Sequence, residues 1–288
     1  VSIKGVTLFI LKTPFLIHII KKYKKSECIF EGGTTLSLLI MYYFAFLKLT
    51  YHVFPQNIEF IAPKAKPDNY FRSNCYKYNF EIESYKSAKS VTTVSTFDKA
   101  ILECHQIKSF LLDSFPIKSN YKILRSIALK RKKLINKKNS RIKNILLIGT
   151  ISNHPTKEGL IKIINYLNTK KLPYNINLVG YGTSEFSKFA SEKINVLGTV
   201  TESKLTELMV NTHCLVINTI QTSGYLFKVV EFNLSEIPII FTSNFIQHMN
   251  LEEYGIFHSD LNNLQNIIEE IKPNFKFKKF KKPIISWL

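Results

Sequence analysis

The sequence has few cysteines, few glycines and few prolines for a chain of its length. Its 288 residues include 10 Gly, 10 Pro and 4 Cys. The cysteines form no CxxC pair and have no histidine at metal-ligand spacing, which excludes a disulfide-rich scaffold and a zinc finger. We therefore expect a reduced, cytosolic protein. The four positions are Cys28, Cys75, Cys104 and Cys214.

The sequence also lacks a hydrophobic run long enough to cross a membrane. The longest candidate, Leu36 to Leu47, has 12 residues, whereas a spanning helix needs about 20. We interpret it as a helix buried against a parallel sheet. Nothing near the start resembles a secretory signal, and we expect the natural N-terminus to lie upstream of Val1.

Acidic residues are scarce. Against 40 Lys and Arg there are 21 Asp and Glu, so that the formal charge is +19. Such a surplus attracts phosphates of a nucleotide, an anionic lipid or a nucleic acid, although solvated faces with biased composition give the same pattern. No nucleic-acid-binding motif is present, and we expect no nucleic-acid partner. The basic clusters are 21–25, 130–143 and 276–282.

The first half of the chain alternates between helix-like and strand-like segments. A βαβ unit is predicted from a strand at 27–30, a helix from Thr34 or Thr35 to about Lys48, and a strand at 50–54. We read residues 60–85 as irregular, and 130–143 as an interdomain linker. Further segments are a helix over 1–20, a strand at 90–95, and a helix capped by Ser95 or Thr96.

The second half alternates more regularly, which predicts a doubly wound parallel sheet. The apolar strand 144–148 is of the kind buried on both faces. We therefore predict two α/β domains, at 1–135 and 136–288. Further strands are expected at 176–179, 194–197, 214–218 and 238–242, and helices at 158–167, 184–192, 202–210, 227–234 and 260–271.

Several spaced motifs in the second half resemble the donor domain of group-1 glycosyltransferases with the GT-B fold. The strand ending at Gly149 is followed by Asn153-His154-Pro155, as in the family's first strand and loop. A second strand ends in Gly180-Tyr181-Gly182. The segments 196–200 and 223–231 resemble N-V-x-x-L-G-x-V and S-G-x-x-x-K-x-x-E.

The resemblance implies a retaining, metal-independent enzyme that transfers a sugar from a nucleotide diphosphate sugar to an acceptor hydroxyl. No cofactor is implied. A helix N-terminus at the crevice of an open α/β sheet attracts the diphosphate. Lys228 is expected to bind that diphosphate and Glu231 the ribose hydroxyls. The donor-site candidates are Gly149, Asn153, His154, Gly180, Gly182, Ser223, Gly224, Lys228 and Glu231.

The first half resembles the acceptor domain of the same family, with two departures. Gln56, Asn57 and Glu59 match an H-N-x-E segment, but Gln56 replaces the histidine and cannot act as an acid or base in the usual way. The family's first strand and glycine loop would lie upstream of Val1, so we expect an incomplete N-terminal Rossmann-like domain. A glycan or lipid-linked acceptor at an anionic inner membrane surface would suit a role in cell-surface polysaccharide or glycolipid synthesis. An inactive nucleotide- or glycan-binding relative and a basic nucleic-acid-binding protein are the alternatives.

Overall fold

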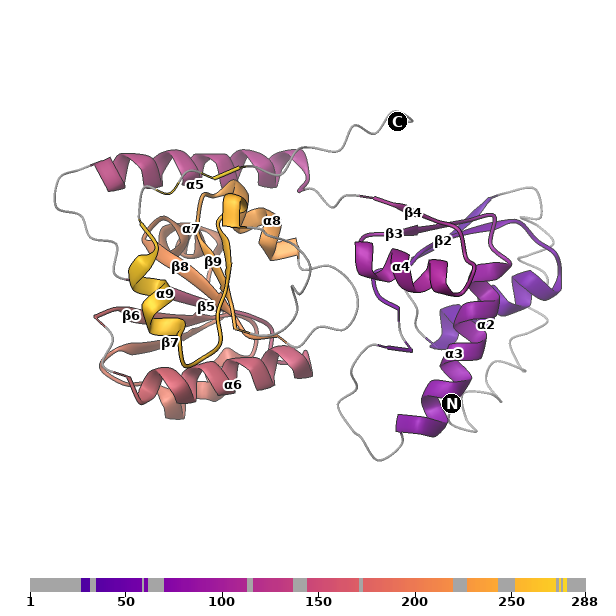
Figure 1. Ribbon diagram of the computed structural model, residues 1–288, viewed down its shortest axis with the longest axis horizontal. Helices are drawn as coiled ribbons and strands as arrows, with labels where there is room; N and C mark the ends of the chain where they lie inside the picture. Colours follow the sequence, from indigo (N-terminus) through magenta and orange to yellow (C-terminus); the bar gives the residue numbers. More distant parts are fainter. Residues whose placement is uncertain are drawn as a thin grey trace. The chain divides into compact units, whose positions relative to one another are not determined.

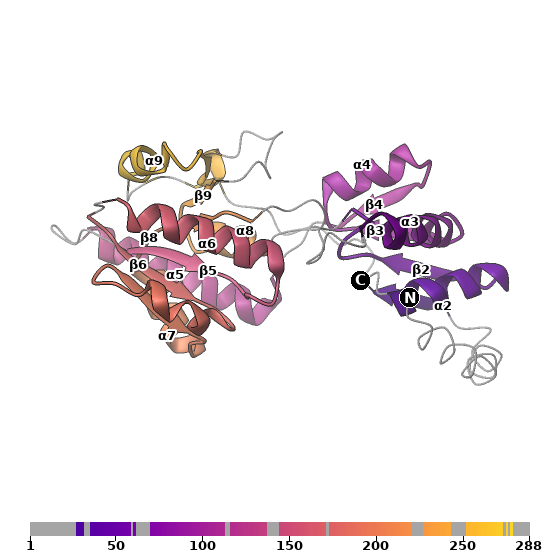
Figure 2. The ribbon, with the colours of Figure 1, turned by 90° about the horizontal axis from the view of Figure 1, so that it is seen from below.

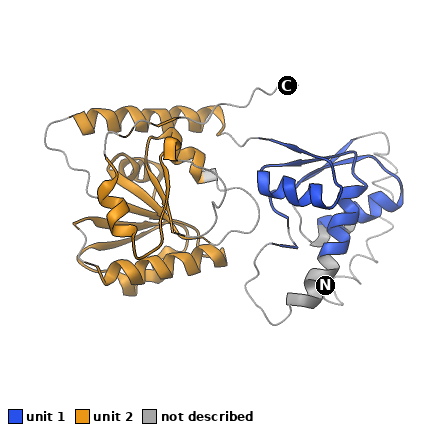
Figure 3. Cartoon of the chain, in the orientation of Figure 1, with its two compact units in different colours: residues 1–113, 222–225 blue, residues 114–221, 226–288 orange. Residues whose placement is uncertain are grey.

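The computed structural model divides the chain into two compact units, and each is described by itself (Figure 3). Unit 1 comprises residues 1–113 with 222–225, and unit 2 comprises 114–221 with 226–288. The residues that the structure describes are 27–31, 35–58, 60–61, 70–112, 116–136, 144–170, 173–219, 227–242, 252–272, 275 and 277–278. The predicted helix over 1–20 lies outside them.

Unit 1 contains a parallel sheet of four strands in the order β1-β2-β3-β4. Buried side chains of the helices described in this unit pack with Tyr51 and Val53 of the sheet in one hydrophobic core. The predicted βαβ unit is confirmed. The strands are β1 (Cys28–Glu31), β2 (Tyr51–Phe54), β3 (Ser90–Thr93) and β4 (Ser109–Leu111), and the helices are α2 (Thr35–Phe46), α3 (Tyr70–Lys86) and α4 (Thr96–Cys104). Ser95 is the N-cap of α4, and its side chain accepts a hydrogen bond from the Asp98 amide.

Helix α3 corrects the reading of 60–85 as irregular. Its buried side includes the polar residues Glu81 and Ser84 beside Ile82 and Tyr85. The Glu81 carboxylate accepts hydrogen bonds from the Phe60 amide at 2.9 Å and from the Tyr85 hydroxyl at 2.8 Å. Because polar residues that are paired in this way can be buried, the apolar periodicity that would reveal the helix is interrupted.

Unit 2 contains six parallel strands in the order β10-β9-β8-β5-β6-β7. The predicted doubly wound sheet is therefore confirmed, and its strand order reverses between β5 and β8. In such sheets the crevice at the reversal, outside the carboxyl ends of the strands, is where ligands bind. The strands are β5 (Asn144–Ile148), β6 (Asn175–Val179), β7 (Ile194–Gly198), β8 (Thr212–Ile217), β9 (Ile239–Phe241) and β10 (Ile256–His258).

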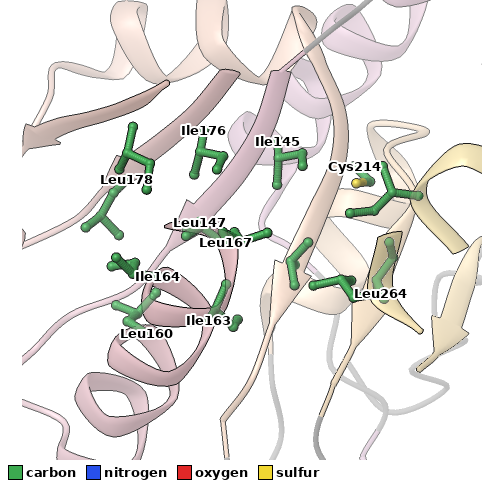
Figure 4. Close-up of a cluster of buried hydrophobic side chains, with 14 of the residues drawn as sticks. Ile145, Leu147, Leu160, Ile163, Ile164, Leu167, Ile176, Leu178, Cys214 and Leu264 are labelled. Atoms are coloured by element: carbon green, nitrogen blue, oxygen red, sulfur yellow. The ribbon is translucent and has the colours of Figure 1, made fainter. Parts of the chain in front are cut away.

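Helices cover both faces of this sheet, as Figures 1 and 2 show. On one face α6 packs against β5 and β6 in the main hydrophobic core, to which α9 adds Leu264 (Figure 4). On the other side, α5 contacts α7 and α8. The helical elements are α5 (Lys118–Asn136), α6 (His154–Asn168), η2 (Thr183–Phe189), α7 (Glu202–Val210), α8 (Phe227–Leu234), η3 (Glu252–Tyr254) and α9 (Leu264–Glu270).

Helix α5 continues to Asn136 and so occupies the first half of the predicted linker 130–143. The buried Arg131 explains this difference. Its guanidinium donates hydrogen bonds to the carbonyl oxygens of Glu236 and Met209, at 3.1 Å each, and to those of Val210 and Thr212. These bonds attach α5 to the rest of unit 2. The unit begins at residue 114, whereas the predicted second domain begins at 136.

Smaller differences concern the ends and types of elements. The predicted helix over 184–192 is the 3-10 helix η2, which begins at Thr183 after the N-cap Gly182, whose φ is 79°. The predicted helix over 260–271 is shorter, because Asp260 Oδ1 accepts a hydrogen bond from the Asn263 amide before α9 starts. Strands β4 and β10, of three residues each, were not predicted because so short a run carries no periodicity.

Candidate functional site

The candidate donor site lies at the carboxyl edge of the six-stranded sheet, where β5 and β8 end. The backbone there is tightly packed. Gly180 has φ of +140°, and a Cβ at this residue would lie 1.9 Å from the Gly149 carbonyl oxygen. A Cβ at Gly159 would lie 1.5 Å from the carbonyl oxygen of Asn218, which follows β8. Only glycine permits these approaches, and they join the ends of β5, β6 and β8 to the start of α6.

Helix α6 starts at this edge with free backbone N–H groups. Asn153 is its N-cap with an extended backbone, and the Asn153 side chain makes no capping hydrogen bond. The first turn of a helix has amide groups without intrahelical partners and carries partial positive charge. Pro155 in this turn has no backbone N–H to offer. The other amides of the turn can bind an anion at the end of β5.

The ring of His154 is paired with a carboxylate of its own helix. Its Nε2 lies 3.4 Å from Glu158 Oε1, one turn further along α6, and both side chains are largely exposed. The geometry therefore fits a surface pair on the first turns of α6. A role for His154 in lining the donor site stays a prediction.

Lys228 brings a cation to the same edge from α8. Its Nζ donates a long hydrogen bond, 3.4 Å, to the carbonyl oxygen of Ile148, the last residue of β5. Burial lowers the pKa of Lys228, and the nearby charge of Glu231 opposes this shift. Among the described residues, no carboxylate lies within ion-pair distance of the ammonium. The charge is thus held at the end of β5 without direct neutralisation.

Glu231 lies one turn after Lys228 on the same helix. Its side chain is partly buried, and burial raises the pKa of its carboxyl, an effect that the Lys228 charge opposes. Each group is thus harder to ionise than in water, and each partly compensates the other. Pairs of titratable groups perturbed in this way gather at functional sites, which makes the pair a candidate for ligand binding at this edge.

The structure brings together the described donor-site candidates Gly149, Gly180 and Lys228 at the ends of β5 and β6. Gly182 belongs to the turn after β6, where a Cβ would lie 2.6 Å from Ile151 Cγ1. Ser223 and Gly224 lie outside the described residues. Their assignment to the donor site therefore stays a prediction.

The acceptor-side candidates follow β2 in unit 1. Gln56 Nε2 donates a hydrogen bond of 2.6 Å to Glu31 Oε1, at the end of β1. Asn57 is partly exposed beside it, and Glu59 lies outside the described residues. Glu31 was not among the predicted site residues, although a carboxylate at the end of a strand and directly before Gly32-Gly33 is a signal that could have found it.

Metal sites and membrane-spanning helices are the other features to consider among the described residues. No group of three or more His, Cys, Asp and Glu side chains in that part of the chain could hold a metal ion. Metal independence nevertheless stays a prediction. No helix among those residues has both the length and the apolar character needed to cross a membrane.

Comparison with known proteins gives similarity in structure only. No protein-family model matches the sequence, and no curated protein matches it. Sucrose-phosphate synthase from Thermosynechococcus elongatus is similar over 93% of this chain and 71% of its own, with a TM-score of 0.66 and 13% identity. HepE from Anabaena, in complex with UDP-glucose, is similar over 90% of this chain and 73% of its own, with a TM-score of 0.60 and 14% identity.

A third structure with the same fold carries a different activity. UDP-GlcNAc 2-epimerase from Neisseria meningitidis, bound to UDP-GlcNAc, is similar over 94% of this chain and 73% of its own, with a TM-score of 0.52 and 13% identity. Together with the two parallel sheets, these likenesses show that the chain has the α/β fold of GT-B glycosyltransferases. At such identities they show the fold alone, and function has to be argued from the site.

Proposed function

We propose that this chain is a glycosyltransferase that binds a nucleotide diphosphate sugar at the carboxyl edge of β5 and β8. The observation that carries the proposal is the Lys228 ammonium, which lies 3.4 Å from the last carbonyl of β5 without a carboxylate partner among the described residues. A partly buried cation that no carboxylate contacts costs stability, which the nearby charge of Glu231 offsets only in part. Binding of an anion would remove this cost, and a diphosphate is the anion that the fold's crevice accommodates.

The chemical role of the site is electrostatic. Transfer of a glycosyl group leaves negative charge on the departing diphosphate. Lys228 and the free amides at the start of α6 are placed to stabilise it, as preorganised donors do at sites of developing charge. Glu231 would accept hydrogen bonds from the ribose hydroxyls. A UDP-sugar is the first donor to test, since the similar HepE and epimerase structures contain UDP-glucose and UDP-GlcNAc.

The finer parts of the proposal concern the outcome of transfer and the acceptor. We propose retention of anomeric configuration without a metal ion, a glycan or lipid-linked acceptor, and a place in cell-surface polysaccharide or glycolipid synthesis at the cytoplasmic side of a membrane. On the acceptor side, Gln56 and Glu31 offer hydrogen bonds to an acceptor hydroxyl. Gln56 would position that hydroxyl, because an amide does not exchange protons as a histidine does.

A nucleotide-sugar epimerase is the second candidate, favoured by the UDP-GlcNAc 2-epimerase that shares the fold. The two reactions differ in their products. Incubation with UDP-GlcNAc and a mixture of sugar acceptors, followed by mass spectrometry and NMR, would give a new glycoside and free UDP for a transferase. For an epimerase it would give the 2-epimer without an acceptor. Absence of either product despite tight UDP binding would favour an inactive binding relative.

The binding part of the proposal is tested by calorimetric titration of UDP, GDP and uridine. Glu231→Gln, which is nearly the same shape, should weaken the preferred nucleoside diphosphate by about 1.5–3 kcal/mol, the range for a hydrogen bond to a charged group. Glu202→Gln is the matched control, since Glu202 is exposed on α7. If the parent binds no nucleoside diphosphate, or both variants bind like the parent, the proposed donor site is wrong.

A further inference from the structure

Helix α5 carries three lysines on the side that faces away from the rest of unit 2. Its buried residues are Leu124, Ile127, Ala128 and Arg131. At 100° per residue, Lys118, Lys122 and Lys133 all lie within an arc of about 60° opposite that buried side. We call these three residues, with Leu129 between them, the lysine row.

The charges of the lysine row are not neutralised within unit 2. Helix α5 contains no Asp or Glu. Lys132, at the side of the row, is paired with Glu236 at 3.3 Å. Lys118, Lys122 and Lys133 have no ion-pair partner among the described residues. Lys99 and Lys204, on other helices, are by contrast each paired with a glutamate on their own helix.

Apolar side chains accompany this charge. Leu129 lies within the lysine row and is 57% exposed, and Ile117, directly before the helix, is 70% exposed. Large apolar side chains surrounded by lysines are unfavourably exposed to water. They can be buried at the boundary between lipid headgroups and acyl chains. Long lysine stems allow the ammonium groups to stay at headgroup level meanwhile.

We propose that the lysine row of α5 is a docking surface for a bilayer of anionic phospholipid. The row spans about 22 Å, from 15 steps of 1.5 Å, which suits a helix lying flat on a surface. An anionic lipid is favoured over nucleic acid because two exposed apolar side chains, Leu129 and Ile117, accompany the charge and can enter a bilayer, whereas a phosphate backbone offers them no apolar contact. This interaction does not depend on the identity of the donor or on catalysis.

Sedimentation with vesicles of phosphatidylcholine, with and without phosphatidylglycerol, tests the proposal on the full chain. Each lysine near an anionic surface contributes about fivefold in partitioning, so Lys118→Gln/Lys122→Gln/Lys133→Gln should weaken binding to the anionic vesicles roughly 100-fold. Binding of the parent should also fall as salt rises. Leu129→Ser should weaken binding by a factor that changes little with salt, because the apolar contribution is not screened.

The matched control is Lys162→Gln/Lys170→Gln/Lys188→Gln, which removes the same charge from exposed lysines of α6, its C-terminal end and η2. It should bind anionic vesicles like the parent. Equal loss in both triple variants, equal binding of the parent to neutral vesicles, or no vesicle binding at all would overturn the proposal. So would displacement from the vesicles by duplex or single-stranded nucleic acid at lower concentration than lipid. Thermal unfolding and UDP titration of each variant separate loss of docking from loss of folding or of the donor site.

Discussion

Replacing Lys228 by Met should separate ligand binding from folding, because the lysine is unfavourable for the free protein. Burial lowers its pKa below the ordinary value. Between the folded and the ordinary pKa the unfolded chain binds more protons, so the contribution of Lys228 to stability rises with pH through that window. At neutral pH the charged side chain therefore has a desolvation cost that Glu231 compensates only in part, and Met removes this cost while keeping the length of the stem.

The balance of small terms sets the expected change in stability. Met loses the 3.4 Å hydrogen bond to Ile148, which is at the low end of about 0.5–1.5 kcal/mol, and it loses the attraction to Glu231. Relief of the desolvation cost is of similar size for a partly buried charge. We expect the free energy of unfolding to stay within about 1 kcal/mol of the parent's. As pH rises from neutral toward the ordinary lysine pKa, the parent should gain stability relative to the variant.

Binding should respond very differently. Loss of a charge-assisted hydrogen bond to phosphate should weaken UDP by about 1.5–3 kcal/mol, or about 10- to 150-fold, while uridine is little affected. Urea unfolding at neutral and alkaline pH, with calorimetric titration of both ligands, measures the two effects. Lys162→Met on the exposed side of α6 is the control. A decrease of more than about 2 kcal/mol in the free energy of unfolding of the free protein would contradict the expected stability. Equal weakening of UDP and uridine would contradict the assignment of Lys228 to the diphosphate.

Three further substitutions test the fold around the site by urea unfolding. Gly159→Ala should lower the free energy of unfolding by about 3 kcal/mol or more, since its Cβ would lie 1.5 Å from the Asn218 carbonyl oxygen; a smaller change would contradict the packing of α6 on the end of β8. Arg131→Met should cost about 3 kcal/mol, because it leaves buried carbonyl acceptors without their donor, whereas exposed Lys132→Met should cost at most about 1 kcal/mol. Ser95→Ala should cost about 1 kcal/mol through loss of the α4 cap, and an unchanged midpoint would speak against that hydrogen bond.

The elements of unit 2 could largely be predicted from the sequence, because most of its strands contain a short apolar run, as in β5 and β9. The strand 144–148, the helix 202–210 and the helix 227–234 are confirmed within a residue or two. A parallel strand that is buried on both faces needs no alternation of apolar and polar residues. A short apolar run followed by glycine is therefore enough to indicate it. Order along the chain then fixed the doubly wound topology.

Elements that bury polar groups could not be predicted in this way. Helix α3 places Glu81 and Ser84 on its buried side, and α5 buries Arg131. In each case the polar group is satisfied by partners distant in sequence, such as the Phe60 amide for Glu81 and the Glu236 carbonyl for Arg131. A single sequence gives the residue type but not the partner, and an unpaired charge would have made burial unfavourable.

The candidate site shows the same division. Glycines at strand ends and the spacing of Lys228 and Glu231 pointed to the carboxyl edge of the sheet. The contact of Lys228 with Ile148 joins residues 80 positions apart, and it depends on how α8 packs beside β5. Likewise, the hydrogen bond between Gln56 and Glu31 follows from the parallel pairing of β1 and β2, which local patterns do not specify.

Hydrogen–deuterium exchange with and without UDP is the sharpest test of the proposed donor site, because it locates the ligand on the chain. UDP should slow exchange at the amides of 149–157, which follow β5 and begin α6, and of 227–231 in α8, while amides of α9 and the amino ends of the strands exchange unchanged. Protection confined to other segments, or no protection at a UDP concentration that saturates calorimetric binding, would contradict it.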